Sequence, residues 1–367
     1  MTIARPQFEH RVLSALEATP VRIPVLIGGC GTGRTHLLRG LRDHLGLDAC
    51  QYLDVERSAS TPERMLRSVV TSSPFLAPDV SAEAASPRAA FDALLAFFQG
   101  ARGPGDRPVT FLFDEALEFR TFENFPGLRH VLRDLVQGLS QSTNRFVLTT
   151  RYVTRALRFF RDQTGGIELI ALTPLSVDEV RAVVPPSQAA DPEVLSAIHA
   201  LSDGHAGYAQ AIGQAMASLG GADPISALAS LLSPEAALTR EMTYSYELRL
   251  HRARGYGALK GILDILATEE PLTLTEIALR LQRTPGSTKD YLSWLEDVDL
   301  VTVRQKRYSF ADPLLRLWVR LHCRPEPPED GEVARQVQHY ALSRLPQPEP
   351  ALVGAGRTSR SGIIEID

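Results

Sequence analysis

Short, continuously apolar runs alternate with amphipathic stretches through the first half of the chain. Five such runs are predicted strands, at residues 23–27, 51–55, 109–115, 145–151 and 167–172. Helices are predicted around these strands, where apolar residues recur every three or four positions, at residues 6–18, 35–45, 61–70, 88–99 and 127–139. Continuous apolar runs are typical of parallel strands that are buried on both faces. The pattern therefore predicts an α/β domain with a doubly wound parallel sheet over residues 1–174.

From Leu175 onward the apolar periodicity is wholly helical. Ser176 and Glu179 have the spacing of a capping box, which marks the start of a helix. Further helices are predicted at residues 190–202, 206–219 and 225–250. We interpret residues 175–252 as a helical lid domain beside the sheet.

The pattern changes again near residue 253. Three predicted helices precede two short apolar runs that form a hairpin around Gln305-Lys306; the helices lie at residues 258–268, 273–281 and 287–298, and the runs at 300–304 and 307–310. Three helices and a hairpin indicate a winged helix-turn-helix domain at residues 253–324, with a further helix at 312–323 packed on it. A C-terminal helix is predicted within residues 325–345. The polar, proline-broken tail at residues 346–367 is predicted to be disordered.

Composition narrows the class of protein. A chain of 367 residues with 44% hydrophobic and 22% charged residues has the make-up of a soluble globular protein with two or three domains. A net charge of −4 gives no general attraction to nucleic acids or membranes. Cys30, Cys50 and Cys323 are widely spaced, which favours a reducing compartment and argues against a structural zinc site. With no 18-residue apolar run, we expect a cytoplasmic protein without a membrane partner.

A glycine-rich stretch follows the first predicted strand and opens a helix. From Gly28 it matches the P-loop pattern G-x-x-x-x-G-K-[ST] at every fixed position except Arg34. Backbone N–H groups of such a turn surround phosphate oxygens, and the helix dipole adds to the attraction. The turn thus predicts a site for ATP or ADP formed by Gly28, Gly29, Cys30, Gly31, Thr32, Gly33, Arg34, Thr35 and His36. Thr35 is predicted to ligate Mg²⁺. The alternative is a glycine-rich turn without a ligand.

Arg34 occupies the position where a P-loop has lysine. Arginine keeps the positive charge and binds two phosphate oxygens at once, but it is longer and planar, and therefore not equivalent. The chain uses arginine generally, since Lys260, Lys289 and Lys306 are its only lysines among 39 basic residues. We expect nucleotide binding together with slow hydrolysis.

Two predicted strands end in polar residues suited to phosphate chemistry. Residues 109–115 form an apolar strand that ends in Asp114 and Glu115, the Walker B arrangement. Asp114 would hold Mg²⁺, and Glu115 would act as general base toward the attacking water. In P-loop folds with an additional strand, the end of the next strand lies beside the P-loop. Arg151 is therefore predicted to sense the terminal phosphate; the alternative is a surface arginine.

The winged-helix segment carries a small basic group. Ser287, Thr288 and Lys289 would enter the major groove of duplex DNA, and Arg304, Lys306 and Arg307 of the wing would contact phosphates. Residues 257–324, however, hold 10 basic and 9 acidic residues, whereas DNA readers usually show a denser basic face. A purely structural or protein-docking winged helix is the alternative.

Together these segments resemble a known family. GGCGTGRT, FLFDE, VLTTR, LTPLSVDEV and YSFADPLLRLW are similar to the archaeal-type ATPases of the STAND branch of AAA+ proteins. They are more distantly similar to origin recognition ATPases and plant NB-ARC switches. The resemblance covers roughly residues 6–324 and implies Arg151 as the sensor arginine. It also implies a Gly-x-Pro motif against the adenine, where this chain has Gly204-His205-Ala206 without the proline.

Two functions remain open at this stage. The resemblance implies a nucleotide-dependent switch or assembly factor that acts with a protein partner or as a homo-oligomer. The other is a non-hydrolysing P-loop adaptor that recruits DNA or a protein through its winged helix. Asp114, Glu115 and Thr35 favour the first, and Arg34 favours the second. Arg129, Arg133 and Arg145 are alternatives for an arginine finger, and the sequence does not choose among them.

Overall fold

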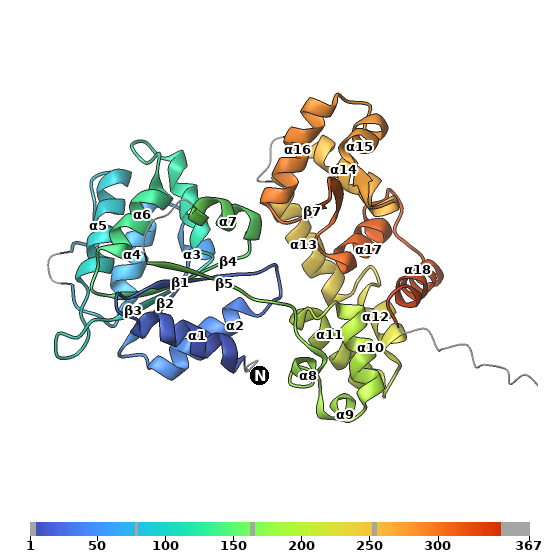
Figure 1. The fold of residues 1–367 in the computed structure, drawn as a ribbon, viewed down its shortest axis with the longest axis horizontal. Helices are drawn as coiled ribbons and strands as arrows, with labels where there is room; N and C mark the ends of the chain where they lie inside the picture. The colour runs from blue at the N-terminus through green and yellow to red at the C-terminus, as the bar shows by residue number, and fades with distance from the viewer. Residues whose placement is uncertain (1–4, 78–79, 162–165, 252–254, 346–367) are drawn as a thin grey trace, which may run out of the picture.

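The computed structural model describes residues 5–77, 80–161, 166–251 and 255–345. Its main sheet has five parallel strands in the order β2-β3-β4-β1-β5 (Figure 1). The strands are β1 (Ile23–Ile27), β2 (Cys50–Asp54), β3 (Thr110–Asp114), β4 (Arg145–Thr150) and β5 (Ile167–Ala171). The predicted parallel α/β sheet is confirmed. Because β4 lies between β1 and β3, the sheet has the additional strand that the sequence predicts.

Helices cover both faces of this sheet. They are α1 (Pro6–Glu17), α2 (Arg34–Leu45), α3 (Val55–Ser58), α4 (Pro62–Ser72), α5 (Pro87–Gly100), the 3₁₀ segment η1 (Ala116–Asn124), α6 (Val131–Ser140) and α7 (Val153–Arg161). Alternate strand residues face opposite sides, as the two-residue period of a strand requires. Leu26 and Leu112 pack with α1 and α2, whereas Val25, Phe111 and Phe113 belong to the larger core on the other side.

A helical segment follows β5. It comprises α8 (Val177–Val180), α9 (Pro186–Ala189), α10 (Pro192–Ser202), α11 (Ala206–Ser218), α12 (Pro224–Leu231) and α13 (Ala237–His251). The Ser176 and Glu179 capping box is present at α8. The prediction of one helix over residues 225–250 is wrong, because α12 and α13 are separate. Pro234 lies in the break, where its ring and missing N–H are incompatible with a helix interior.

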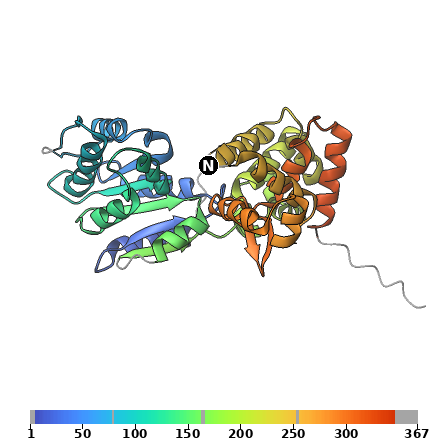
Figure 2. The ribbon, with the colours of Figure 1, turned by 90° about the horizontal axis from the view of Figure 1, so that it is seen from above.

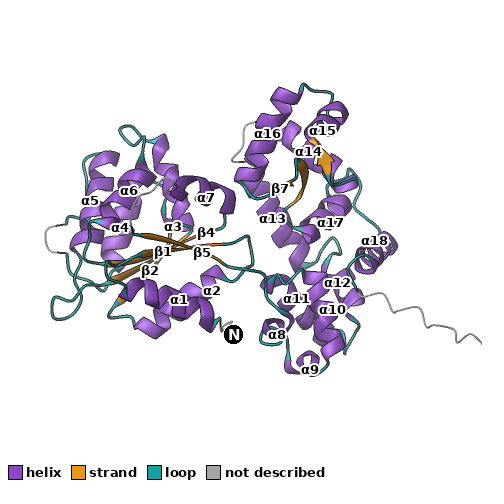
Figure 3. Cartoon of the chain, viewed as in Figure 1, coloured by secondary structure: helices purple, strands orange, loops and turns teal. Residues whose placement is uncertain are grey.

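A second, smaller sheet belongs to the C-terminal part of the chain, which is mostly helical (Figure 3). The elements are α14 (Tyr256–Thr268), β6 (Leu272–Thr273), α15 (Leu274–Arg280), α16 (Pro285–Asp297), β7 (Val301–Arg304), β8 (Arg307–Phe310), α17 (Pro313–His322) and α18 (Asp330–Leu342). We call α14 to α17 the C-terminal unit. Its three strands are antiparallel in the order β6-β8-β7. The order of helices and hairpin is the predicted one, but α16 begins at Pro285, two residues before the predicted start at residue 287.

The sheet with its helices lies beside the helices that follow β5 in both views (Figures 1 and 2). The C-terminal unit contacts the sheet half where α16 packs on α7. Within the described ranges, no helix is both long and apolar enough to cross a membrane. The tail at 346–367, for which the sequence predicts disorder, lies outside the described residues.

Candidate functional site

The glycine-rich turn joins the carboxyl end of β1 to α2. It lies where the parallel strands of the main sheet end, a region that we call the sheet edge. Gly31 and Gly33 adopt φ values of 71° and 88°, in the left-handed region that favours glycine. A Cβ atom on Gly28 would lie 2.7 Å from the Thr32 hydroxyl. The backbone is therefore compact where the sequence predicts a phosphate-binding turn. His36, the last residue of the predicted site, is exposed in the first turn of α2.

Three hydroxyl groups converge on the Asp114 carboxylate at the end of β3. Thr35 Oγ1 and Tyr52 OH donate to Asp114 Oδ2 at 2.8 and 2.7 Å, and Thr149 Oγ1 donates to Oδ1 at 2.6 Å. A hydroxyl beside one carboxylate suits Mg²⁺, which prefers oxygen ligands and usually keeps waters and substrate phosphates as further ligands. Clusters of three or more His, Cys, Asp or Glu side chains suited to a metal are absent from the described residues. The Thr35 and Asp114 pair therefore fits Mg²⁺ held together with a nucleotide.

Glu115 lies directly after β3 with a buried carboxylate and a φ of 58°. Oε1 accepts a hydrogen bond from Arg34 Nη2 at 2.8 Å, and Oε2 accepts one from the Arg151 backbone N–H at 3.0 Å. The Glu115 N–H donates to Thr149 Oγ1 at 3.1 Å. Both carboxylate oxygens of the predicted general base are thus engaged by groups of the protein.

Arg34 is buried at the start of α2. Besides the Glu115 ion pair, its Nη1 donates to the carbonyl of Gly29 at 2.7 Å, and its Nε has no hydrogen-bond partner among the described residues. The structure therefore brings Arg34, Thr35, Asp114 and Glu115 together, as the sequence predicts. It places the Arg34 guanidinium between the P-loop carbonyl of Gly29 and Glu115, the predicted general base.

Arg151 lies at the carboxyl end of β4, among acidic side chains. It forms ion pairs with Glu56, Glu115 and Glu118, the last two at 3.6 Å. Burial alone would lower the pKa of Arg151, but the neighbouring carboxylates, Glu115 first, raise it overall. This arginine is not a solvated surface group. Its role as a phosphate sensor stays a prediction, and Thr149 is the β4 side chain that contacts Asp114.

Two residues from the helical segment contact the P-loop. A Cβ atom on Gly31 would lie 1.6 Å from Cε1 of His205, so the imidazole ring rests directly on this glycine. Burial lowers the pKa of His205, which keeps the ring neutral near pH 7. Arg249 of α13 donates from Nη2 to Cys30 Sγ at 2.6 Å. Sequence reasoning missed Arg249, because nothing in the local pattern of α13 indicates a contact 219 residues away.

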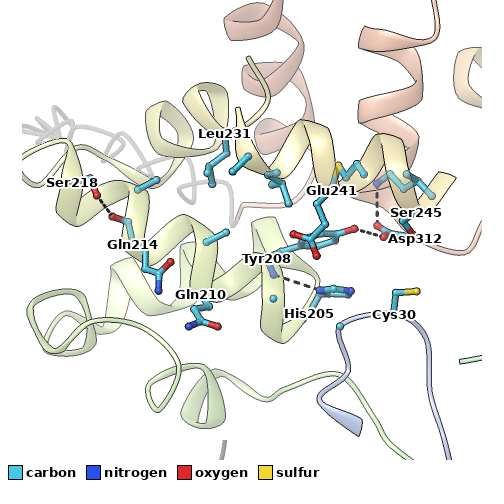
Figure 4. A pocket seen from close by; sticks show the side chains of 18 of the residues that line it. Cys30, His205, Tyr208, Gln210, Gln214, Ser218, Leu231, Glu241, Ser245 and Asp312 are labelled. Carbon is cyan, nitrogen blue, oxygen red and sulfur yellow. Dashed lines mark hydrogen bonds between the residues drawn. The ribbon is translucent and has the colours of Figure 1, made fainter. Parts of the chain in front are cut away.

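A cavity of about 370 Å³ lies where the P-loop, the helical segment and the C-terminal unit meet. The P-loop contributes Gly28 to Cys30 and Thr32, the helical segment His205 and Arg249, and the C-terminal unit Asp299, Val301, Thr302, Arg304 and Asp312, among others. A larger neighbouring cavity, of about 600 Å³, extends between α11 and α13. Figure 4 shows Cys30, His205 and Tyr208 at one end of it, with the Tyr208 hydroxyl donating to Asp312 at 2.6 Å.

The predicted DNA contacts do not form one group. Thr288 is fully buried and its hydroxyl donates to the Thr284 carbonyl, so the prediction of a groove contact there conflicts with its position inside the fold. Ser287 is half-buried, whereas Lys289 and Lys306 are exposed. Arg304 and Arg307 are also exposed. Arg304 lines the 370 Å³ cavity, and Nη1 of Arg307 lies 3.8 Å from Oε2 of Glu276.

Compared with family models, curated proteins and solved structures, the chain has matches among the solved structures alone. No family model matches the chain, and no curated protein matches it. Among solved structures, a Walker-type ATPase of Pyrococcus abyssi matches with a TM-score of 0.63 at 17% identity, covering 87% of this chain and 96% of that one. The chain has an AAA+ P-loop ATPase fold.

Two further structures match this chain less well. The Orc1 protein of Aeropyrum pernix in complex with DNA gives a TM-score of 0.44 at 16% identity, covering 91% of this chain and 90% of that one. The RuvB Holliday junction branch migration motor of Thermotoga maritima gives 0.43 at 14% identity, covering 84% of this chain and 92% of that one. At these identities the likeness concerns the fold, so the function of this chain has to be argued from its own residues.

Proposed function

We propose that this chain is a nucleotide-dependent molecular switch or assembly factor that binds ATP or ADP with Mg²⁺ and hydrolyses ATP slowly. The observation that carries the proposal is the shared cavity. P-loop residues Gly28 to Cys30 form one wall, while His205, Arg249 and the Asp299 turn form others. A nucleotide in this cavity would contact three parts of the chain at once, so its phosphates would influence how these parts are arranged.

The residues at the sheet edge have separable roles. The P-loop N–H groups and Arg34 would bind phosphates, and Thr35 and Asp114 would hold Mg²⁺, which neutralises phosphate charge when bound. Glu115 would take the proton of the attacking water at a carboxylate oxygen. Since that carboxylate is paired with Arg34 and with the Arg151 N–H, it has to leave these partners first. This requirement supports slow hydrolysis.

The switch would act through domains with the boundaries that the sequence predicts. Residues 1–174 bind the nucleotide, residues 175–252 form the lid, and residues 253–324 form a winged helix. Residues 325–345 hold the C-terminal helix. A protein partner or further copies of the chain would recognise the rearranged surface, which is the sense in which we propose an assembly factor.

A non-hydrolysing adaptor is the second candidate function. The pairing of Glu115 with Arg34 favours it, because a carboxylate engaged by a buried guanidinium is not free to contact an attacking water. Such an adaptor would use exposed Lys289 and Lys306 to contact duplex DNA, or another face of the winged helix to contact a protein.

One experiment separates these functions. The nucleotide carried by the purified full-length protein is identified, and ATP binding and turnover are measured with and without Mg²⁺. Tight binding with slow, Mg²⁺-dependent turnover supports the switch, and binding without turnover supports the adaptor. Thr35→Ala, which removes one predicted Mg²⁺ ligand, is the matched variant. If neither ATP nor ADP binds to the wild-type protein, both nucleotide-based proposals are wrong.

A further inference from the structure

Helix α7 obtains its N-terminal cap from a distant part of the chain. The cap is Asp299, in the turn between α16 and β7, which we call the wing turn (Val298 to Leu300). Asp299 Oδ2 accepts a hydrogen bond from the Val153 N–H at 2.8 Å, and Oδ1 accepts one from the Thr154 N–H at 3.5 Å. A carboxylate at this position satisfies N–H groups that have no partner inside the helix and interacts favourably with the helix dipole. The start of α7 therefore depends on the docking of the C-terminal unit.

Other contacts hold the wing turn in the same place. The Asp297 carboxylate, at the end of α16, lies 3.1 Å from Arg158 Nη2 of α7. Arg249 donates from Nη1 to the Asp299 carbonyl at 3.4 Å and from Nη2 to Cys30 Sγ. The turn is thus connected both to α7 and, through one buried guanidinium, to the P-loop.

The capped end of α7 is adjacent to the predicted general base. Arg151 lies two residues before the helix, and its backbone N–H donates to Glu115 Oε2 at 3.0 Å. When Asp299 fixes the first N–H groups of α7, it also fixes the position of the Arg151 N–H. Release of the wing turn would remove the Asp299 acceptor from the start of α7, where the Val153 N–H would keep its other acceptor, the Arg151 carbonyl at 3.0 Å, and would allow Glu115 to leave Arg151.

We propose that Asp299 is a positioning residue: by capping α7 from the C-terminal unit, it holds the Arg151 N–H on Glu115 and keeps the docked chain in a slow state. The turnover part of this inference rests on the proposed nucleotide function, whereas the coupling between the cap and Arg151 belongs to the chain itself. Undocking of the C-terminal unit then links partner binding to release of the general base. The wing turn acts through backbone N–H groups and does not itself touch the reacting atoms.

Two substitutions at position 299 separate the effect of losing the cap from the effect of straining the backbone. Asp299 has a φ of 52°, so alanine there would add strain unrelated to capping. Asp299→Gly suits this φ and removes the carboxylate, whereas Asp299→Asn suits it and keeps an oxygen acceptor that caps helices about equally well. Arg158→Gln removes the neighbouring ion pair and leaves the cap in place, which makes it the control for weakened docking alone.

Hydrogen exchange of the amides at 151, 153 and 154 is measured in the full chain without nucleotide. Because an N-cap of this kind changes a local equilibrium by roughly five- to thirtyfold, we expect these amides to exchange faster by that factor in Asp299→Gly. Asp299→Asn should remain close to wild type. The inference is wrong if the Arg151 amide is unaffected while those of Val153 and Thr154 respond, or if Asp299→Asn behaves like Asp299→Gly.

Turnover gives the second readout. In Asp299→Gly the kcat for ATP should rise by a similar roughly five- to thirtyfold factor, and kcat is the quantity that decides, because Asp299 also lines the nucleotide cavity and its loss can change KM. Where wild-type turnover is undetectable, the release rate of bound fluorescent ADP takes its place and should rise likewise. Unchanged kcat and release in a variant whose amides do exchange faster would overturn the link to Glu115. If wild type binds no nucleotide, the proposed function fails, and the amide measurement still decides the coupling.

Discussion

The edge of the main sheet and the C-terminal unit hold their candidate functional residues in different ways. At the sheet edge, Asp114 and Glu115 are buried, and each accepts hydrogen bonds from α2 and from β4 or the residue that follows it. In the C-terminal unit, Lys289 and Lys306 are exposed on separate elements, and Thr288 is buried. One set forms a connected network, whereas the other consists of separate side chains.

This difference determines which predictions each region supports. A buried polar network is costly when a member is left unsatisfied, so its geometry is narrowly constrained and each member has a definable role. Exposed cations make no such demand and are compatible with DNA binding or with an ordinary solvated surface. The sheet edge therefore supports specific predictions about chemistry. The C-terminal unit supports predictions about the cavity it lines and the helix it caps.

The largest effect should come from Glu115→Gln, which tests whether the sheet edge performs chemistry. Glutamine keeps the size and an oxygen acceptor but does not take up a proton. Turnover should fall by about 10²–10⁴-fold while ATP affinity remains near that of wild type. Steady-state hydrolysis and calorimetry measure the two quantities. A variant that hydrolyses ATP as wild type does would exclude Glu115 as the base.

Arg34→Ala removes the only side-chain cation of the P-loop. Because a hydrogen bond to a charged group contributes roughly 1.5–3 kcal/mol, ATP affinity should fall about ten- to a hundredfold. The variant also removes the closer of the two ion pairs of the buried Glu115 and leaves the one with Arg151, so its thermal stability should be lower as well.

Arg34→Lys is the matched control for this experiment. It keeps the charge and should retain ATP binding, with faster turnover if the arginine is what slows hydrolysis. Equal ATP affinity in wild type and Arg34→Ala, measured by calorimetry, would refute the role of Arg34 in phosphate binding.

Docking of the wing turn should depend on pH. Burial raises the pKa of Asp299 to about 6, although the Val153 and Thr154 N–H groups and the cations Arg249 and Arg34 act in the opposite direction. In an undocked chain this carboxylate would have its ordinary pKa near ~4. Between these values the docked form binds more protons, so docking is stronger at low pH and weakens as the pH rises through about 6.

After allowance for partial exposure of Asp299, we expect a change of about 1–2 kcal/mol in the docking equilibrium. Small-angle scattering at pH values of about 4.5 and 7.5, on either side of this range, measures the fraction of extended molecules. Asp299→Asn, which does not titrate, should show a smaller difference between these conditions. An extended fraction that increases at low pH would contradict the assigned sign.

The smallest effect concerns DNA. If Lys289 and Lys306 contact duplex phosphates, reversing each charge should reduce the slope of log affinity against log salt by roughly 0.9. Neither change should alter nucleotide affinity. Arg304→Glu is the contrasting variant, because Arg304 lines the P-loop cavity and its reversal should weaken ATP binding. Absence of salt-dependent DNA binding in the full chain, with or without ATP, would leave these lysines as solvated surface.

Much of the sheet edge was predictable from sequence because its determinants are local. The strand β1, the glycines and the start of α2 are consecutive, and Asp114 directly ends an apolar strand. The turn at Gly31 and Gly33 requires positive φ, which identifies it without knowledge of the rest of the fold. The pairing of Arg34 with Glu115 was not predictable, because it depends on the order of the strands, in which β4 separates β1 from β3.

Features that depend on distant contacts could not be predicted. Helix α7 is capped by Asp299, 146 residues away from Val153. The apolar periodicity places Thr288 on the third helix of the unit, but its burial depends on the packing of neighbouring helices. The sequence around His205 does not indicate a contact with the P-loop, because the position of this ring on Gly31 follows from the placement of α11.

The contact between His205 and Gly31 has a consequence for experiments on the arrangement in which α11 lies against the P-loop. It is a van der Waals contact between a neutral ring and a glycine, so dissolved ions do not screen it as they screen the Arg158 ion pair. High salt alone should therefore leave α11 against the P-loop. A single methyl group at position 31 has no room beside the ring, so Gly31→Ala would push the two surfaces apart without changing any charge, and it would also strain the turn at its φ of 71°. That substitution offers a sterically opened form of the molecule.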